Sequence, residues 1–147
     1  MTNLKEHLSG KRLAGIDYGT KRIGLAVCDE LHISVKPVTT ISTAKKNYID
    51  EICNILASER VEAVVIGKPD TYDGKKIDFH EKIDSFGNEI QKKFHADVYY
   101  TDESFSSISA ASFMVSYGIK KKDRAAKGTI DKYAAAIILQ QFLNELE

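Results

Sequence analysis

The chain has 147 residues, of which 43% are hydrophobic and 29% charged, a composition typical of a folded globular protein. Basic and acidic side chains both number 21, so the formal net charge is zero and nucleic-acid binding through overall charge alone is disfavoured. No apolar run approaches the roughly 20 residues of a membrane span, and the polar N-terminus lacks a signal-peptide core. We therefore expect a single domain over residues 1–147, cytoplasmic and without membrane association.

The cysteines and histidines favour no zinc site. Cys28 and Cys53 stand far apart, without a CxxC motif or neighbouring histidine pairs, so we expect buried free thiols rather than a disulfide framework. The four histidines are scattered along the chain and are expected on the surface: His7, His32, His80 and His95.

Short apolar runs predict three antiparallel strands at the start of the chain. Residues 13–18 and 23–29 are separated by the tight turn Gly19-Thr20-Lys21-Arg22, and residues 33–41 continue the meander. Pro37 lies inside the third run and cannot donate a hydrogen bond to a ladder, which indicates an edge strand or a bulge.

Two helix–strand units follow the meander. Residues 45–58 have helical apolar spacing, with Ser42 or Thr43 as the expected N-cap, and residues 63–66 form a continuous apolar strand. After a loop over residues 68–78, apolar residues recur at helical spacing.

The rest of the chain is predicted as helix 79–94, strand 97–101, helix 107–117 closed by Gly118, and helix 129–146. Three antiparallel strands followed by two helix-linked parallel strands give a five-stranded mixed sheet flanked by helices, which is an α/β fold. This element order is also that of the RNase H-like fold, although other mixed α/β topologies share it.

Carboxylates follow two of the predicted strands. Asp17 ends the first apolar strand, where an unpaired charge is costly unless a cation or hydrogen bonds compensate it; alternatively, it only begins the hairpin turn. Asp102 and Glu103 follow the last strand, and only one of two adjacent strand residues can point to a given face. Glu103 has the longer reach, and the alternative role for Asp102 is that of a helix-entry or turn residue.

A third carboxylate, Asp131, lies in the first turn of the last helix after the expected cap Thr129. An acid is favourable there whatever its function, because it complements the helix dipole. However, Ala134, Ala135 and Ala136 follow, and small side chains let a helix dock closely on a sheet. Three acids delivered by two strand ends and a helix start can share one or two Mg²⁺ or Mn²⁺ ions and support phosphodiester hydrolysis.

Basic residues form two groups that predict either nucleic-acid-binding patches or merely solvated surface. One group brackets the first strand: Lys11, Arg12, Lys21 and Arg22. The other occupies eight positions before the last helix: Lys120, Lys121, Lys122, Arg124 and Lys127.

The sequence resembles the YqgF/RuvX family, described both as Holliday junction resolvases and as nucleases that process the 5′ end of pre-16S ribosomal RNA. The resemblance rests on four blocks of the chain: residues 15–26, 65–69, 102–103 and 131–139. It implies an RNase H-like nuclease whose metal-binding catalytic acids are Asp17, Glu103 and Asp131. It also implies that Lys21 and Arg22 lie within reach of substrate phosphate and that the 120–127 segment grips the nucleic acid.

Two positions depart from the family pattern. Ser104 stands where the family usually has an arginine after Asp-Glu, and Lys68 stands where it favours leucine. Loss of an arginine removes a fork-shaped donor suited to phosphate or carboxylate, so it concerns rate, substrate choice or rigidity more than metal binding.

The favoured function is metal-dependent processing of a ribosomal RNA precursor, with cleavage of a branched DNA junction as the alternative. A symmetric junction resolvase would dimerise, whereas an RNA-trimming nuclease can be a monomer or a weak homodimer. A catalytically weakened nucleic-acid-binding module is a second class of function. The Asp-x-Gly-Thr turn also resembles the phosphate-binding hairpin of actin-like ATPases, but those enzymes close two such domains around a nucleotide.

Overall fold

The computed structural model describes residues 3–69, 76–103, 112, 114–116, 118–124 and 129–146. The strands are β1 (Leu13–Tyr18), β2 (Arg22–Cys28), β3 (Val35–Ser42), β4 (Ala63–Pro69) and β5 (Asp97–Glu103). The helices are α1 (Leu4–Leu8), α2 (Tyr48–Ser58), α3 (Lys76–Phe94), α5 (Lys121–Arg124) and α6 (Thr129–Leu146). Within these ranges no helix is both long and apolar enough to cross a membrane.

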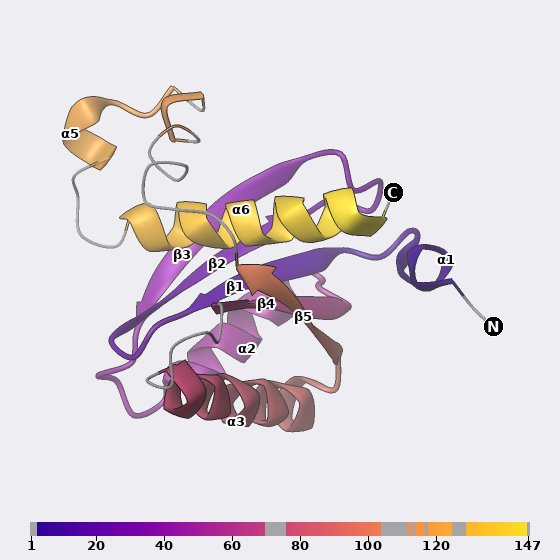
Figure 1. The fold of residues 1–147 in the computed structure, drawn as a ribbon, viewed down its shortest axis with the longest axis horizontal. Helices are drawn as coiled ribbons and strands as arrows, with labels where there is room; N and C mark the ends of the chain where they lie inside the picture. The colour runs from indigo at the N-terminus through magenta and orange to yellow at the C-terminus, as the bar shows by residue number, and fades with distance from the viewer. Residues whose placement is uncertain are drawn as a thin grey trace.

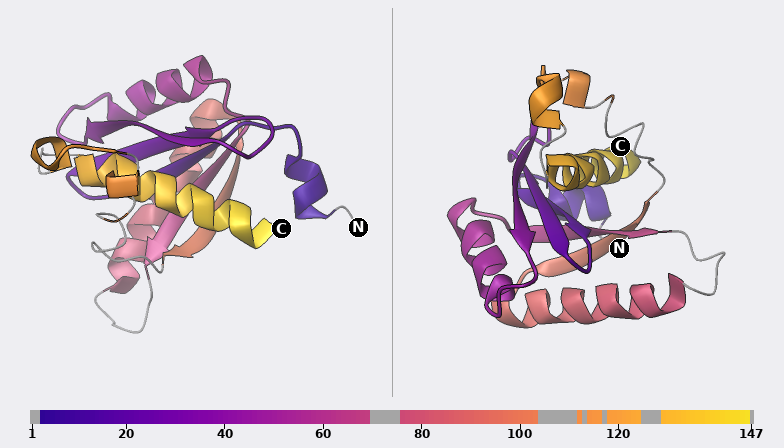
Figure 2. Two further views of the ribbon diagram at one scale, coloured as in Figure 1. Left: turned by 90° about the horizontal axis from the view of Figure 1, so that it is seen from above. Right: turned by 90° about the vertical axis from the view of Figure 1, so that its left-hand side faces the viewer.

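The five strands form one mixed sheet in the order β3-β2-β1-β4-β5. β1, β2 and β3 pair antiparallel, and β4 pairs parallel with both β1 and β5, which confirms the predicted mixed sheet. Helix α6 covers one face of the sheet, and α2 and α3 cover the other, so the molecule has three layers (Figures 1 and 2).

Each face of the sheet has its own apolar core because strand side chains alternate between the two layers. The α2/α3 side buries Ile16, Ile23, Leu25, Ile52, Leu56, Ile66, Ile83 and Ile90. The α6 side buries Leu13, Ala26, Cys28, Val65, Ala135, Ile138 and Leu139. β4 is buried on both faces over residues 63–67, as its continuous apolar run predicts.

Helix α2 and strand β3 differ from the predicted bounds. β3 begins at Val35 instead of residue 33, and α2 begins at Tyr48 after Asn47, whose side chain makes no capping bond. The expected N-cap was wrong: Ser42 Oγ accepts from the Ala44 amide at 3.2 Å, and Thr43 Oγ1 donates to the Thr20 carbonyl at 2.5 Å. Strand β3 stays paired with β2 as far as Ser42. The side chains of Ser42 and Thr43 therefore stabilise the turn after β3 and do not cap a helix.

Pro37 lies in an edge strand, and the register between β2 and β3 shifts between Leu25 and Ala26 beside it. Both expectations for this proline, an edge position and a bulge, are confirmed. At the opposite side of the sheet β4 and β5 extend beyond their apolar runs because they continue to pair with each other as far as Pro69 and Glu103.

Most of the predicted helix 107–117 lies outside the described residues. Its C-terminal signal is confirmed, since Gly118 has a φ of +74°. The Gly118 amide donates to Val115 at 2.9 Å and the Ile119 amide to Met114 at 3.1 Å, which is the paired bonding of a Schellman motif. Of the two thiols, Cys28 is buried as expected and Cys53 is only partly buried.

Candidate functional site

Asp17 lies near the carboxyl end of β1 on the face of the sheet that α6 covers. Leu13, Gly15 and Asp17 alternate along the strand and share that face, with Leu13 in the core against α6. Asp17 is partly buried and is paired in register with Gly24 of β2. The strand therefore presents this carboxylate beneath the start of α6.

Helix α6 approaches the sheet closely because glycines face it. A methyl group at Gly24 would collide with the Asp131 carbonyl oxygen, and one at Gly15 would lie 2.5 Å from the Ala135 carbonyl oxygen. The alanines at 134–136 are at most 3% exposed, which confirms the predicted close docking of the helix. Since Gly24 is the register partner of Asp17, this contact brings the Asp131 backbone beside the strand pair that carries Asp17.

These glycines were missed in the sequence, although glycine inside a strand is itself a sign of close approach by another backbone. Helix α6 runs from Thr129 to Leu146, which confirms the predicted bounds of this helix.

Asp131 is bound by an arginine of the facing strand. The Arg22 guanidinium donates from Nε to Asp131 Oδ2 at 2.8 Å, and the two side chains are 39% and 22% exposed. The expected substrate-binding residue Arg22 thus contacts a candidate catalytic acid directly. Lys21, its neighbour in the turn, is exposed.

The third acid comes from a strand that is parallel to β1 but not adjacent to it, since β4 lies between β1 and β5. Ile16 pairs with Ile66, which pairs with Tyr100, so Glu103 lies three residues beyond the level of Ile16. Residues 99 and 103 face the same side of the sheet because they are four positions apart in the strand. The ring of Tyr99 lies 5.9 Å from the Phe142 ring of α6, so this is the side that α6 covers. The side chain of Glu103 lies outside what the structure describes.

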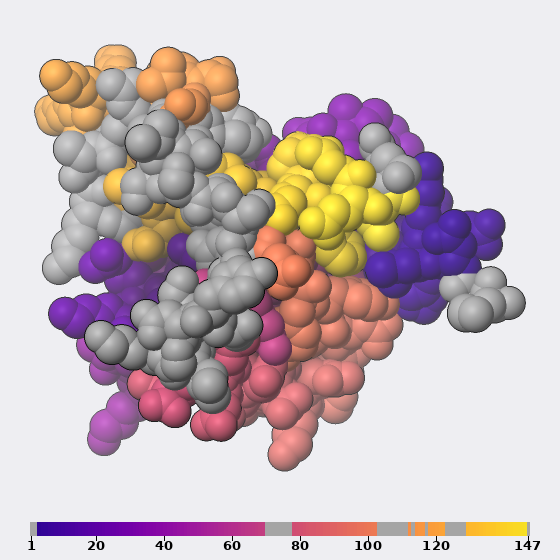
Figure 3. Space-filling model, viewed as in Figure 1, coloured from indigo at the N-terminus to yellow at the C-terminus, as the bar shows by residue number. Residues whose placement is uncertain are grey.

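Helix α6 also fixes the end of β5. The buried Thr101 hydroxyl donates to the Glu145 carboxylate at 3.3 Å, and the Gln141 amide donates to the Asp102 carbonyl at 2.6 Å. Asp102 itself is exposed. One helix therefore contacts both strand ends from which the candidate acids come; in the space-filling view it lies directly against β5 (Figure 3).

The second basic group lies near the start of α6. Lys120, Lys121 and Lys122 are exposed, and the backbone of Arg124 ends the short helix α5, which contacts α6. Lys127 lies outside the described residues. Their predicted role in gripping nucleic acid stays a prediction.

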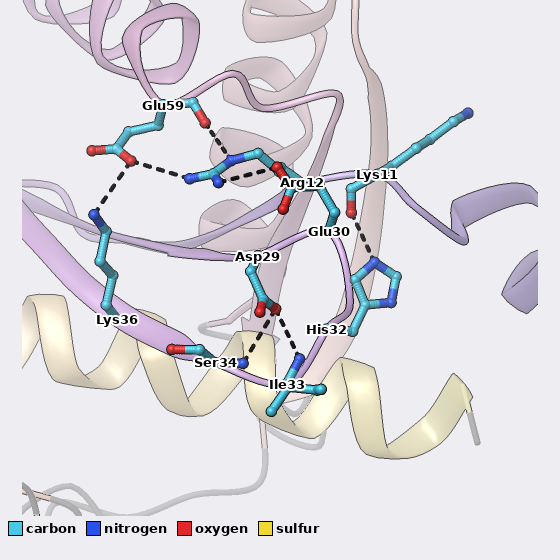
Figure 4. A network of polar contacts seen from close by, with 9 residues as sticks. All are labelled: Lys11, Arg12, Asp29, Glu30, His32, Ile33, Ser34, Lys36 and Glu59. Carbon is cyan, nitrogen blue, oxygen red and sulfur yellow. Dashed lines mark hydrogen bonds and ion pairs between the residues drawn. The ribbon is translucent and has the colours of Figure 1, made fainter.

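Arg12 is not part of the site. It precedes β1, at the opposite end of the strand from Asp17, and its Nε donates to the Glu59 carbonyl at 2.7 Å. Its terminal nitrogens pair with the Glu30 and Glu59 carboxylates at 3.4 and 3.5 Å, as Figure 4 shows. The basic residues that bracket β1 thus divide between two ends of the sheet.

Lys68, the departure from the family pattern, faces the α3 layer. Its Nζ lies 2.6 Å from Asp84 Oδ1 and 4.4 Å from the centre of the Tyr100 ring. The unexpected lysine is therefore paired with its own acidic partner in α3.

The histidines divide between the surface and backbone contacts. His7 and His95 are exposed as expected. The partly buried His32 and His80 have Nε2 within 2.8 Å of the Lys11 carbonyl and 2.5 Å of the Pro69 carbonyl.

The chemistry of the donors fits a hard divalent cation. Asp17 and Asp131 offer carboxylate oxygens, which Mg²⁺ and Mn²⁺ prefer over nitrogen or sulfur ligands. Among the described residues no group of three metal-binding side chains is assembled, and the Glu103 side chain is not among them. The two described acids come from different elements, and the backbone of Asp131 lies against Gly24, the register partner of Asp17.

Known proteins are similar in sequence to this chain over most of its length. A protein from Bacteroides fragilis named "Putative pre-16S rRNA nuclease" is 37% identical over 133 residues, which cover 90% of this chain and 95% of the relative. One from Flavobacterium johnsoniae is 39% identical over 134 residues, covering 90% and 96%.

Solved structures share the fold at low identity. RuvC of T. thermophilus in complex with a Holliday junction has a TM-score of 0.61 at 16% identity and covers 92% of this chain and 95% of its own. The Fowlpox virus resolvase complex has a TM-score of 0.53 at 14% identity, with coverage of 90% and 98%. These structures identify the five-stranded mixed sheet with its flanking helices as a RuvC-like RNase H fold. The family model described as "RuvX: Holliday junction resolvase" matches residues 11–145, and the chain belongs to this RuvX/YqgF family.

Proposed function

We propose that this protein is a divalent-metal-dependent nuclease that processes the 5′ end of a pre-16S ribosomal RNA. The observation that carries the proposal is the convergence of Asp17 and the start of α6 at one sheet edge, achieved through the contact between Gly24 and Asp131. Glu103 supplies the third carboxylate in this proposal, from the end of β5 at the same edge.

In this proposal the chain's own residues position the metal and the substrate. Asp17, Glu103 and Asp131 hold one or two ions, and the exposed lysines of the 120–122 segment contact the RNA backbone. The bound ions supply an activated water and neutralise the charge that develops on the leaving oxygen. Little other catalytic machinery is required of the protein.

We favour ribosomal RNA as the substrate because the relatives at 37–39% identity are named as pre-16S rRNA nucleases. A branched DNA junction is the second candidate, favoured by the description of the family model. A symmetric resolvase needs two active sites, so the second candidate predicts a dimer in solution, whereas RNA processing is compatible with a monomer.

The test offers labelled pre-16S RNA and a four-way DNA junction to the native protein with Mg²⁺, with Mn²⁺ and with EDTA. We expect the RNA to be cut only with metal, and Asp17→Asn to lower the rate about a hundredfold or more, because it removes a metal-binding carboxylate. If neither substrate is cut, or if Asp17→Asn cuts as fast as the native protein, the nuclease assignment is wrong.

A matched pair of variants identifies the working carboxylate of β5. Glu103→Gln is expected to lose cleavage, while Asp102→Asn, at the exposed neighbouring position, is expected to retain it. The reverse result would move the site to Asp102. Cleavage of the junction alone, by a protein with the solution mass of a dimer, would favour the resolvase.

A further inference from the structure

The Arg22 guanidinium binds one carboxylate oxygen of Asp131, a residue that also belongs to the proposed metal site. The distance from Arg22 Nε to Asp131 Oδ2 is 2.8 Å, within the range of a strong charge-assisted hydrogen bond. The side chains are 39% and 22% exposed, so a dissolved cation can reach the carboxylate.

The pair follows from the backbone arrangement. Arg22 begins β2 opposite Ser42 of β3, and two residues later Gly24 contacts the Asp131 carbonyl. Because residues two apart in a strand share a face, Arg22 and Gly24 both face α6. The same register that brings Asp131 to the sheet therefore also places Arg22 on its carboxylate.

Two cations cannot share that oxygen without cost. A divalent ion binds a carboxylate oxygen at about 2.0–2.6 Å, and a guanidinium hydrogen-bonded to the same oxygen would then lie close enough to be repelled. Before metal binds, the guanidinium balances the charge of the partly buried acid.

We propose that Arg22 and the divalent metal compete for Oδ2 of Asp131. The ion pair holds Asp131 in position in the metal-free protein, and metal binding displaces the guanidinium, which then lies beside the site with its donors available to a substrate phosphate. This makes Arg22 a positioning residue whose contact exchanges with the metal. The inference rests on the metal site of the proposed function.

The first experiment measures Mn²⁺ binding by calorimetry without nucleic acid. Arg22→Gln is expected to bind Mn²⁺ about threefold to tenfold more tightly than the native protein, because a competing positive charge is removed. Arg22→Lys, which keeps the charge, should return the affinity toward the native value. The control Lys21→Gln removes an equal charge from the adjacent exposed residue and should change the affinity less than about twofold.

The second experiment uses the native protein and therefore does not depend on the folding of a variant. The NMR signal of the Arg22 Nε–H group should move as Mg²⁺ is added, with the same midpoint as metal binding. An unchanged signal at saturating Mg²⁺, or Arg22→Gln binding Mn²⁺ no more tightly than the native protein, overturns the competition.

The two proposals fail differently. If Asp17→Asn abolishes Mn²⁺ binding while Arg22→Gln leaves it unchanged, the metal site stands and the competition is wrong. If the native protein and Arg22→Gln both fail to bind Mn²⁺, both proposals are wrong.

Discussion

Gly24 sets how closely Asp131 approaches the sheet. Any side chain there would meet the backbone of Asp131, which cannot move aside without shifting the whole start of α6. Gly15 has the same role one helical turn later, against Ala135 and the Leu139 side chain. Both glycines allow helix α6 to dock on the sheet, but only Gly24 contacts the residue that carries the candidate acid, Asp131.

Gly24→Ala is expected to lower the free energy of unfolding by about 1–3 kcal/mol, because the added methyl group overpacks a backbone contact. It should also weaken Mn²⁺ binding, since it displaces Asp131. Gly15→Ala is the matched control: we expect similar destabilisation with little change in metal affinity. Urea unfolding and metal titration of both variants test this, and equal metal affinities in the two variants would contradict it.

Among individual residues, the sequence predicted those with a local pattern but not those whose partners lie far away in the chain. Asp17 was identifiable as a charge ending an apolar strand, and the alanines after Asp131 predicted a close-docked helix. The partner of Arg22 was not identifiable, because that bond joins residues 109 positions apart in the chain and depends on the tertiary register. The same is true of Lys68, whose partner Asp84 is defined only once α3 packs on β4.

At the scale of elements, different contacts hold the two ends of strand β1. Helix α6 contacts the ends of β1 and β5 that carry the candidate acids Asp17 and Glu103. At the other end of β1, Arg12 links the start of the strand to Glu59, which follows α2, and to Glu30 between β2 and β3. Lys36 of β3 also pairs with Glu59 at 3.6 Å (Figure 4).

Arg12→Gln is expected to lower the free energy of unfolding by about 1–2 kcal/mol, because Arg12 is 23% exposed and its hydrogen bonds are partly shielded from water. Metal affinity should not change, since this network lies away from Asp17. Lys11→Gln removes a charge from the adjacent residue and should alter stability by less than about 0.5 kcal/mol. Equal thermal stability of Arg12→Gln and Lys11→Gln would show that the network contributes little.

The element order was largely predictable because each element carries a local pattern: alternation in the meander, helical spacing in α2 and α3, and a continuous apolar run in β4. The bounds were less so where tertiary pairing decides them. β4 and β5 continue through polar residues because each pairs with the other, and Ser42, one of the two expected caps of α2, remains in the β2–β3 ladder. The side chains of Ser42 and Thr43 then stabilise a turn instead of a helix.

At the scale of the whole molecule, the two cores on opposite faces of one sheet are joined through strands that are buried on both sides. Cys28 at the end of β2 belongs to the α6 core and is 1% exposed. Burial raises the pKa of its thiol from 9.0 to about 11. A thiol with this environment is protonated and unreactive in the native state at neutral pH, and its ionisation at higher pH favours the unfolded chain.

This gives a pH dependence with a defined sign. Because the folded-state pKa lies above the unfolded value, the contribution of Cys28 to stability is complete below about pH 9 and is lost as the pH rises toward 11. Between pH 8 and pH 10.5 the native protein should lose about 2 kcal/mol more than Cys28→Ala, whose cavity cost is the same at both pH values. Urea unfolding at the two pH values measures the difference. Cys53→Ala, at the partly buried thiol, should lose nearly as much as the native protein; equal pH dependence of native protein and Cys28→Ala would contradict the assignment.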